Sequence, residues 1–157
     1  MRSIETENAK AYLNGLFTEE RYDSFYLYEA RIKAGLDYYI SGKKNSAYYE
    51  DSEEKKEAEE DEYILWKEIK QTVLSLMKGD RLPISVKLIF MFHRDNIKRL
   101  CEMNNLPVNE NEIGGLFMNL SYEQEKLTIT TGTSLKVFTM DKTLEQLWDA
   151  TVEKFYA

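Results

Sequence analysis

The sequence has one cysteine, one histidine and two prolines, and it has no long apolar run. A single cysteine cannot form an internal disulfide, which fits a reducing cytoplasm. One histidine and one cysteine cannot supply the usual ligands of zinc. The longest apolar run, Leu88 to Phe92, is far too short to span a bilayer, and the acidic start does not resemble a signal peptide. We therefore expect a cytoplasmic protein with no membrane segment, no metal and no cofactor.

Motifs for nucleotide chemistry are also missing, because neither a Walker lysine motif nor a dinucleotide glycine pattern occurs. The tripeptide at residues 93–95 matches the His-Arg-Asp of protein kinases, but the position of the magnesium-binding asparagine is Leu100. Cys101 falls on an apolar stripe with Ile97 and Leu100, which predicts an inert buried thiol and not a nucleophile paired with His93. No catalytic residue is predicted, and a non-enzymatic role is favoured.

Negative charge is concentrated in one segment. The formal net charge is −7, and residues 50–62 contain nine acids and two lysines, which is also −7. The rest of the chain carries 19 acids and 19 bases and is therefore neutral. Because such charge runs are usually solvated, we predict a single domain over residues 1–157 with a mobile acidic loop at 45–62.

Apolar periodicity predicts the secondary structure. Apolar residues at helical spacing predict helices over 5–17, 63–78, 95–104 with Asp95 as N-cap, and 143–155 with a capping box formed by Thr143 and Gln146. Alternating apolar residues predict strands over 25–33, 36–40, 84–92, 116–122, 127–131 and 135–139. In the first of these, the alternation places Tyr26, Tyr28, Ala30 and Ile32 on one face. The strand at 84–92 is apolar on both faces towards its end and is expected near the middle of the sheet.

These elements predict an α+β fold, with an antiparallel sheet of five to six strands and three to four helices packed mainly on one face. The segments that carry a resemblance are 25–32, 63–69, 76–79, 115–120 and 127–149. They resemble a family of short uncharacterised bacterial proteins known only as a domain of unknown function. Gln124-Glu125 departs from the glycine-containing turn of that family. The resemblance implies a self-standing cytoplasmic domain and brings no activity and no catalytic residue.

One candidate site is a hydroxyl-rich stretch that we expect to form a corner at Gly132, between the fifth strand and the short sixth one. Hydroxyls, a flexible glycine backbone and a nearby lysine could bind a phosphate or another small ligand. Threonine is also favoured in strands for its shape, so plain sheet surface is the commoner explanation. The candidate ligand-binding residues are Thr131, Gly132, Thr133, Ser134 and Lys136.

A second candidate is the tyrosine-rich first hairpin, whose interaction residues would be Tyr26, Tyr28, Tyr38 and Tyr39. Basic residues interleaved with these aromatics resemble a surface that stacks nucleic-acid bases, but aromatics also favour protein interfaces. We therefore predict a non-catalytic cytoplasmic binding or interaction domain with a protein partner or a second copy of the chain. A small-ligand protein or enzyme using the Thr131 to Lys136 corner is the alternative, and a single-stranded nucleic-acid binder is less favoured.

Overall fold

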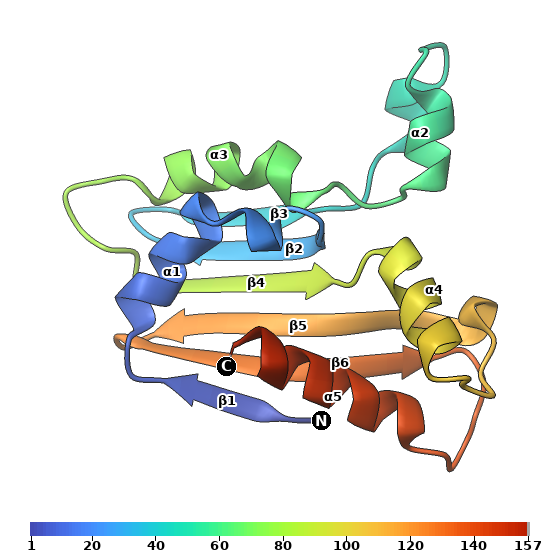
Figure 1. The fold of residues 1–157 in the computed structure, drawn as a ribbon. Coiled ribbons are helices and arrows are strands. Elements are labelled where there is room, and N and C mark those ends of the chain that lie inside the picture. Colours follow the sequence, from blue (N-terminus) through green and yellow to red (C-terminus); the bar gives the residue numbers. More distant parts are fainter. Residues whose placement is uncertain (157) are drawn as a thin grey trace.

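Six antiparallel strands form a single sheet in the computed structural model, which describes residues 1–156 (Figure 1). The strands are β1 (Ser3–Thr6), β2 (Tyr26–Lys33), β3 (Asp37–Ser41), β4 (Ser85–Met91), β5 (Ile113–Glu123) and β6 (Lys126–Leu135). Their order across the sheet is β1-β6-β5-β4-β2-β3. The position of β4 near the middle of the sheet, predicted from its apolar faces, is confirmed.

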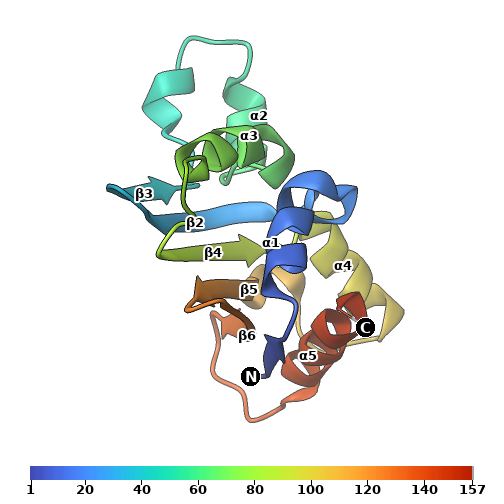
Figure 2. The ribbon, with the colours of Figure 1, turned by 90° about the vertical axis from the view of Figure 1, so that its left-hand side faces the viewer.

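Four helices pack on one face of this sheet, and Figure 2 shows no helix on the other face. They are α1 (Ala9–Thr18), α3 (Trp66–Met77), α4 (Arg94–Met103) and α5 (Thr143–Phe155). A shorter helix, α2 (Lys55–Glu60), stands away from the sheet within the acidic segment. The α+β class is confirmed, and so is the helical cover of one face. No helix among residues 1–156 combines the length and apolarity that a membrane crossing requires.

The core lies between the helices and the side chains that point from the sheet towards them. Alternate residues of β5 supply much of it, from Leu116 to Tyr122, and they face Trp66 of α3 and Trp148 of α5. Both indole N–H groups find backbone acceptors, with Trp66 donating to the carbonyl of Leu16 at 2.7 Å and Trp148 to that of Phe117 at 2.8 Å. Each buried tryptophan therefore packs as a large apolar group and also ties its helix to a neighbouring element.

The β5–β6 hairpin closes through two residues in the left-handed region. Gln124 and Glu125 have φ angles of 51° and 63°, and the flanking residues Glu123 and Lys126 are paired. Positive φ at both central positions is the type I′ turn, which matches the twist of the strands. The departure from glycine seen in the sequence therefore leaves the tight turn in place, although side chains now occupy a conformation that glycine and asparagine adopt more readily.

The first hairpin contains a bulge that changes which side chains face the helices. Leu27 pairs with Phe90, and Glu29 pairs with Ile89, which is adjacent to Phe90 in β4. Tyr28 lies between the two paired residues and is the extra residue of the bulge. Leu27, on one side of the bulge, therefore shares the helical face with Ala30 on the other. The prediction that Tyr26 and Tyr28 share a face with Ala30 and Ile32 was wrong, because strict alternation fails across a bulge.

Three other sequence predictions are corrected. The helix predicted over 5–17 begins only at Ala9, since residues 3–6 pair with the open edge of β6 as β1. The short strand predicted over 135–139 does not exist, because β6 continues without a corner to Leu135, which pairs with Ile113. The acidic segment contains α2 and a 3-10 turn at Ser46–Tyr49, while its mobility stays a prediction.

Both predicted helix caps were also misplaced. The N-cap of α4 is His93, whose Nδ1 accepts a hydrogen bond from the backbone N–H of Asp95 at 3.1 Å. Thr143 is the first residue of α5, and Asp141 accepts from its backbone N–H at 2.9 Å. In both cases the accepting side chain lies two residues before the residue in the first turn that donates its N–H.

Replacing the turn residues with the pair that type I′ turns prefer should stabilise the protein. We expect the double substitution Gln124→Asn and Glu125→Gly to raise the free energy of unfolding by about 1 kcal/mol, because it removes the cost of two side chains in the left-handed region. Urea unfolding with an unchanged m value measures this gain. The control with alanine at both positions keeps the unfavourable backbone conformation, and a similar gain there would contradict the explanation.

Gly42 is packed against the bulged part of β2. A Cβ at this position would lie 1.7 Å from the carbonyl oxygen of Leu27, whereas a Cβ on Gly35 would meet nothing within 4 Å. Gly42→Ala should therefore destabilise the protein by about 2–3 kcal/mol, because backbone must move. Gly35→Ala should change stability by less than about 0.5 kcal/mol. Equal losses in thermal unfolding of the two variants would show that Gly42 is not held by this close approach.

Candidate interaction site

The five residues predicted to bind a ligand extend along β6 and just beyond it. Thr131 and Thr133 face the helices, because they pair with the core residues Met118 and Leu116. Gly132 and Ser134 face the other side of the sheet, and Lys136 is exposed after the strand ends. Neighbouring residues of a strand point in opposite directions. The structure therefore does not bring these five residues together at one point.

Thr131 has a structural role. Its hydroxyl donates to Oδ1 of Asp149 in α5 at 2.5 Å and accepts from the backbone N–H of Arg2 at 2.8 Å. Asp149 is among the few buried charged side chains, so this hydroxyl satisfies a carboxylate that burial would otherwise destabilise. Thr131 thus connects β6 to both α5 and the segment leading into β1.

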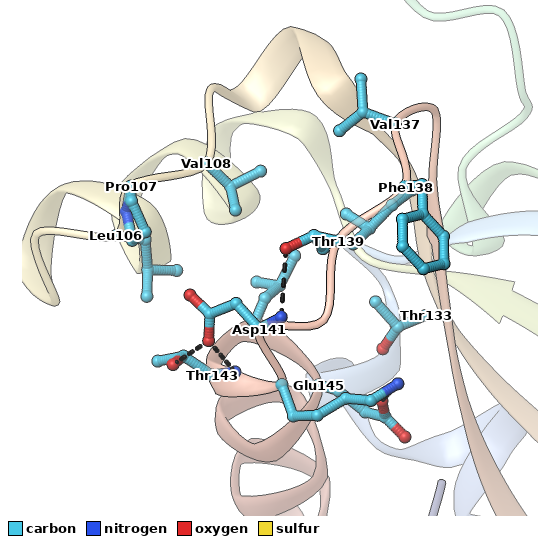
Figure 3. A pocket seen from close by; sticks show the side chains of 13 residues that line it. Leu106, Pro107, Val108, Thr133, Val137, Phe138, Thr139, Asp141, Thr143 and Glu145 are labelled. Carbon is cyan, nitrogen blue, oxygen red and sulfur yellow. Dashed lines mark hydrogen bonds and ion pairs between the residues drawn. The ribbon is translucent and has the colours of Figure 1, made fainter.

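Thr133 lines a hollow of about 270 Å³ at the end of β6 (Figure 3). One wall is formed by Leu106, Pro107 and Val108, which follow α4, and the other by the loop at 137–143. The hydroxyl oxygen of Thr133 is buried and has no hydrogen-bond partner in the described structure. The hollow therefore has both apolar and polar walls, and the unpartnered Thr133 oxygen lies just behind its surface.

The loop between β6 and α5 is held by short side-chain hydrogen bonds. The Asp141 carboxylate accepts from the hydroxyl of Thr143 at 2.6 Å as well as from its backbone N–H, and the Thr139 hydroxyl accepts from the N–H of Asp141 (Figure 3). The hydrogen bonds from Thr143 lower the pKa of the Asp141 carboxyl below its ordinary value. These contacts give the loop a defined shape beside the hollow.

This ordered loop exposes three apolar side chains, which we call the apolar rim: Val137, Phe138 and Met140. Phe138 is 92% exposed and Met140 is 84% exposed. Single exposed apolar residues are common on protein surfaces, but a cluster of large ones next to an apolar hollow is typical of an interaction site. The apolar rim was missed in the sequence because residues 135–139 were interpreted as a short strand that follows a corner at Gly132.

A family model described as a family of unknown function, DUF5721, matches residues 15–157. The chain belongs to the DUF5721 family. The match begins within α1, so it contains both hairpins and the apolar rim but not β1. No curated protein and no solved structure matches the chain. Membership in DUF5721 agrees with the resemblance noted in the sequence and assigns no activity.

The tyrosines predicted as an interaction surface are dispersed in this DUF5721 protein. Tyr26 is buried and donates a hydrogen bond from its hydroxyl to Asp61 at 2.7 Å, and burial together with this bond raises the pKa of the hydroxyl. Tyr28 stacks on Tyr63, with ring centroids 5.4 Å apart. Tyr38 packs at the edge of the core, while Tyr39 is 59% exposed on the bare face of the sheet. Of these four tyrosines, only Tyr39 exposes enough of its side chain to provide a large contact surface.

Two further reactive side chains weighed in the sequence, His93 and Cys101, have local surroundings that the structure defines. The His93 ring stacks on Tyr26 with centroids 4.8 Å apart, and its Nδ1 is occupied by the cap of α4. Cys101 is half-buried, and burial raises the pKa of its thiol. Within residues 1–156, no group of three potential metal-ligating side chains comes together.

The hydrogen bonds of Asp141 predict a specific pH dependence. A carboxyl whose pKa is lowered on folding stabilises the protein above its unfolded pKa of 3.8, and this contribution disappears as pH falls through the lower folded value. Asp141→Ala should therefore lower the melting temperature at pH 7, and its difference from the wild type should shrink below pH 3.8. Asp51→Ala is the control, because it removes an equal charge from an exposed position. A difference for Asp141→Ala that does not change with pH would contradict the mechanism.

Proposed function

We propose that this DUF5721 chain is a non-catalytic bacterial interaction domain of the cytoplasm, which binds a protein partner through the apolar rim and the adjoining hollow. The observation that carries the proposal is the exposure of Phe138 and Met140 on a loop that hydrogen bonds hold in place. Large apolar side chains are concentrated at the centres of protein interfaces, where burial releases water. On a partner surface, the two side chains would become the central anchors of the contact.

The hollow supports this proposal because it offers a place for a side chain of the partner. Its walls contain Leu106, Val108, Leu135 and Leu144, which suit an apolar occupant. Its acidic groups are already engaged, since Asp141 is bonded to Thr143 and Glu145 lies 3.6 Å from the Lys142 ammonium. Such engaged carboxylates favour recognition over acid–base chemistry, which requires a group that can exchange its proton.

A small-ligand protein is the second candidate, and the unpartnered hydroxyl of Thr133 favours it. This oxygen is closed to solvent, so a ligand that accepts or donates a hydrogen bond could satisfy it only after a small movement of the hollow's wall. The two candidates differ in what should contact Phe138. Because Phe138 also lines the hollow, a small ligand would contact only the inner side of its ring, whereas a protein partner would cover the exposed remainder as well.

Site-specific photo-crosslinking in cells separates these candidates. We expect p-benzoylphenylalanine in place of Phe138 to give a light-dependent adduct of higher mass that protease removes. The same photoreactive residue in place of Tyr48 is the matched control, because Tyr48 is an aromatic residue that is 83% exposed on the acidic segment. Absence of an adduct beyond the Tyr48 control would overturn the protein-partner proposal and favour the small ligand.

Adding Met140→Ser to the crosslinking variant tests whether the apolar rim contributes affinity. Loss of one apolar anchor typically weakens an interface by on the order of tenfold. The adduct yield should therefore fall, while the melting temperature should remain within about 2 °C because Met140 makes little contact with its own chain. An unchanged yield would show that the partner approaches Phe138 without using the rim.

A further inference from the structure

The bare face of the sheet contains a basic hollow that is separate from the apolar rim. Its volume is about 270 Å³, and it lies over β2, β3 and β4. The side chains that define this basic hollow are Arg31, Lys33, Asp37, Tyr39, Ser85 and Lys87. Three of them are cations and one is a carboxylate, so its lining has a formal charge of +2 in a chain whose net charge is −7.

Two of these cations are placed directly against each other. Arg31 of β2 is the cross-strand partner of Lys87 of β4, and Lys33 is two residues further along the same face. Like charges directly opposite each other destabilise an antiparallel pair. Glu29 outside the hollow offsets Arg31 through a 2.9 Å contact with its Nε, and Asp37 is the cross-strand partner of Lys33. Neither lysine forms an ion pair anywhere in residues 1–156. Lys87 has only Arg31 and Ser121 as cross-strand partners, so its repulsion from Arg31 is what a bound anion would reduce.

Tyr39 of β3 also lines the basic hollow, next to Arg31. It is the cross-strand partner of Arg31 on β3, and the guanidinium carbon lies 4.9 Å from the centre of its ring. This cation–π contact orients the guanidinium, while Glu29 uses only Nε and leaves both terminal nitrogens for another acceptor. A planar guanidinium held in this way is suited to oxyanions such as phosphate.

We propose that the basic hollow is a binding site for the phosphate group of a ligand. A phosphate offers several acceptor oxygens, which match the donors of Arg31, Lys33 and Lys87. The Ser85 hydroxyl, opposite Lys33, is a further donor. The site is independent of the apolar rim, so either proposal can fail without the other.

Lys87→Gln tests the site through protein stability. Pyrophosphate should raise the urea midpoint of the wild-type protein more than sodium chloride of equal ionic strength does, and Lys87→Gln should abolish that difference. Without pyrophosphate, Lys87→Gln should have a higher midpoint than the wild type, because it removes the repulsion from Arg31. Lys67→Gln is the matched control: it removes the same charge from an exposed position on α3 and should retain the full response to pyrophosphate.

The source of the phosphate is distinguished by anisotropy titrations with a labelled 12-nucleotide single strand and with a labelled adenosine triphosphate. Lys87→Gln should weaken the probe that binds by on the order of tenfold, since a charge-assisted hydrogen bond is lost. Tight binding of the strand alone, with a steep dependence on salt, identifies nucleic acid as the source. Equal or tighter binding of the triphosphate identifies a free nucleotide. The proposal is overturned if no probe binds, or if the wild type, Lys87→Gln and Lys67→Gln respond alike.

Discussion

The register of the β5–β6 hairpin is the constraint on which the rest of the structure depends. The two-residue turn at Gln124 and Glu125 pairs Glu123 with Lys126 and so determines the pairs along the hairpin as far as Gly115 and Ser134, beyond which the register shifts. A shift of one residue would turn the apolar side chains of a strand to the opposite face. It would also move Thr131 away from Asp149, leaving a buried carboxylate without its hydroxyl donor. Apolar packing and a buried polar bond therefore require the same register, which explains why α5 can pack directly on this hairpin.

The sequence contained enough information for the faces of the regular strands but not for the places where regularity fails. Alternation in β4, β5 and β6 predicted the buried side correctly, because each strand needs only its own residues for that pattern. The bulge at Tyr28 depends on β4 and on the close approach of Gly42, both distant in sequence. β1 was missed for a similar reason, since four residues become a strand only when the edge of β6 is present to pair with them.

The candidate sites show the same distinction. Residues 131–136 form a distinctive hydroxyl-rich stretch in the sequence. In the strand, however, successive side chains point to opposite faces of the sheet and do not meet. The stretch that follows was interpreted as a strand because Gly132 was expected to reverse the chain, but it has no partner strand and exposes Phe138 and Met140 instead. The basic residues between the tyrosines were visible in the sequence, whereas their meeting with Lys87 depends on the pairing of β2 with β4. A site formed across strands cannot be recognised before the strand order is known.

The position of the acidic segment explains how a basic hollow can attract anions in an acidic protein. The segment is fastened at its C-terminal end, where Asp61 contacts Tyr26 and Arg94 and the backbone N–H of Lys44 donates to the carbonyl of Glu62. Its attachment is therefore beside the bulge, whereas Lys33 lies at the opposite end of β2, five residues and about 16 Å from Tyr28. The Debye length at physiological salt is about 8 Å, so repulsion from the acidic run is largely screened at the hollow. Local charge and not net charge then governs what the bare face binds, and this is why an acidic isoelectric point does not exclude a phosphate ligand.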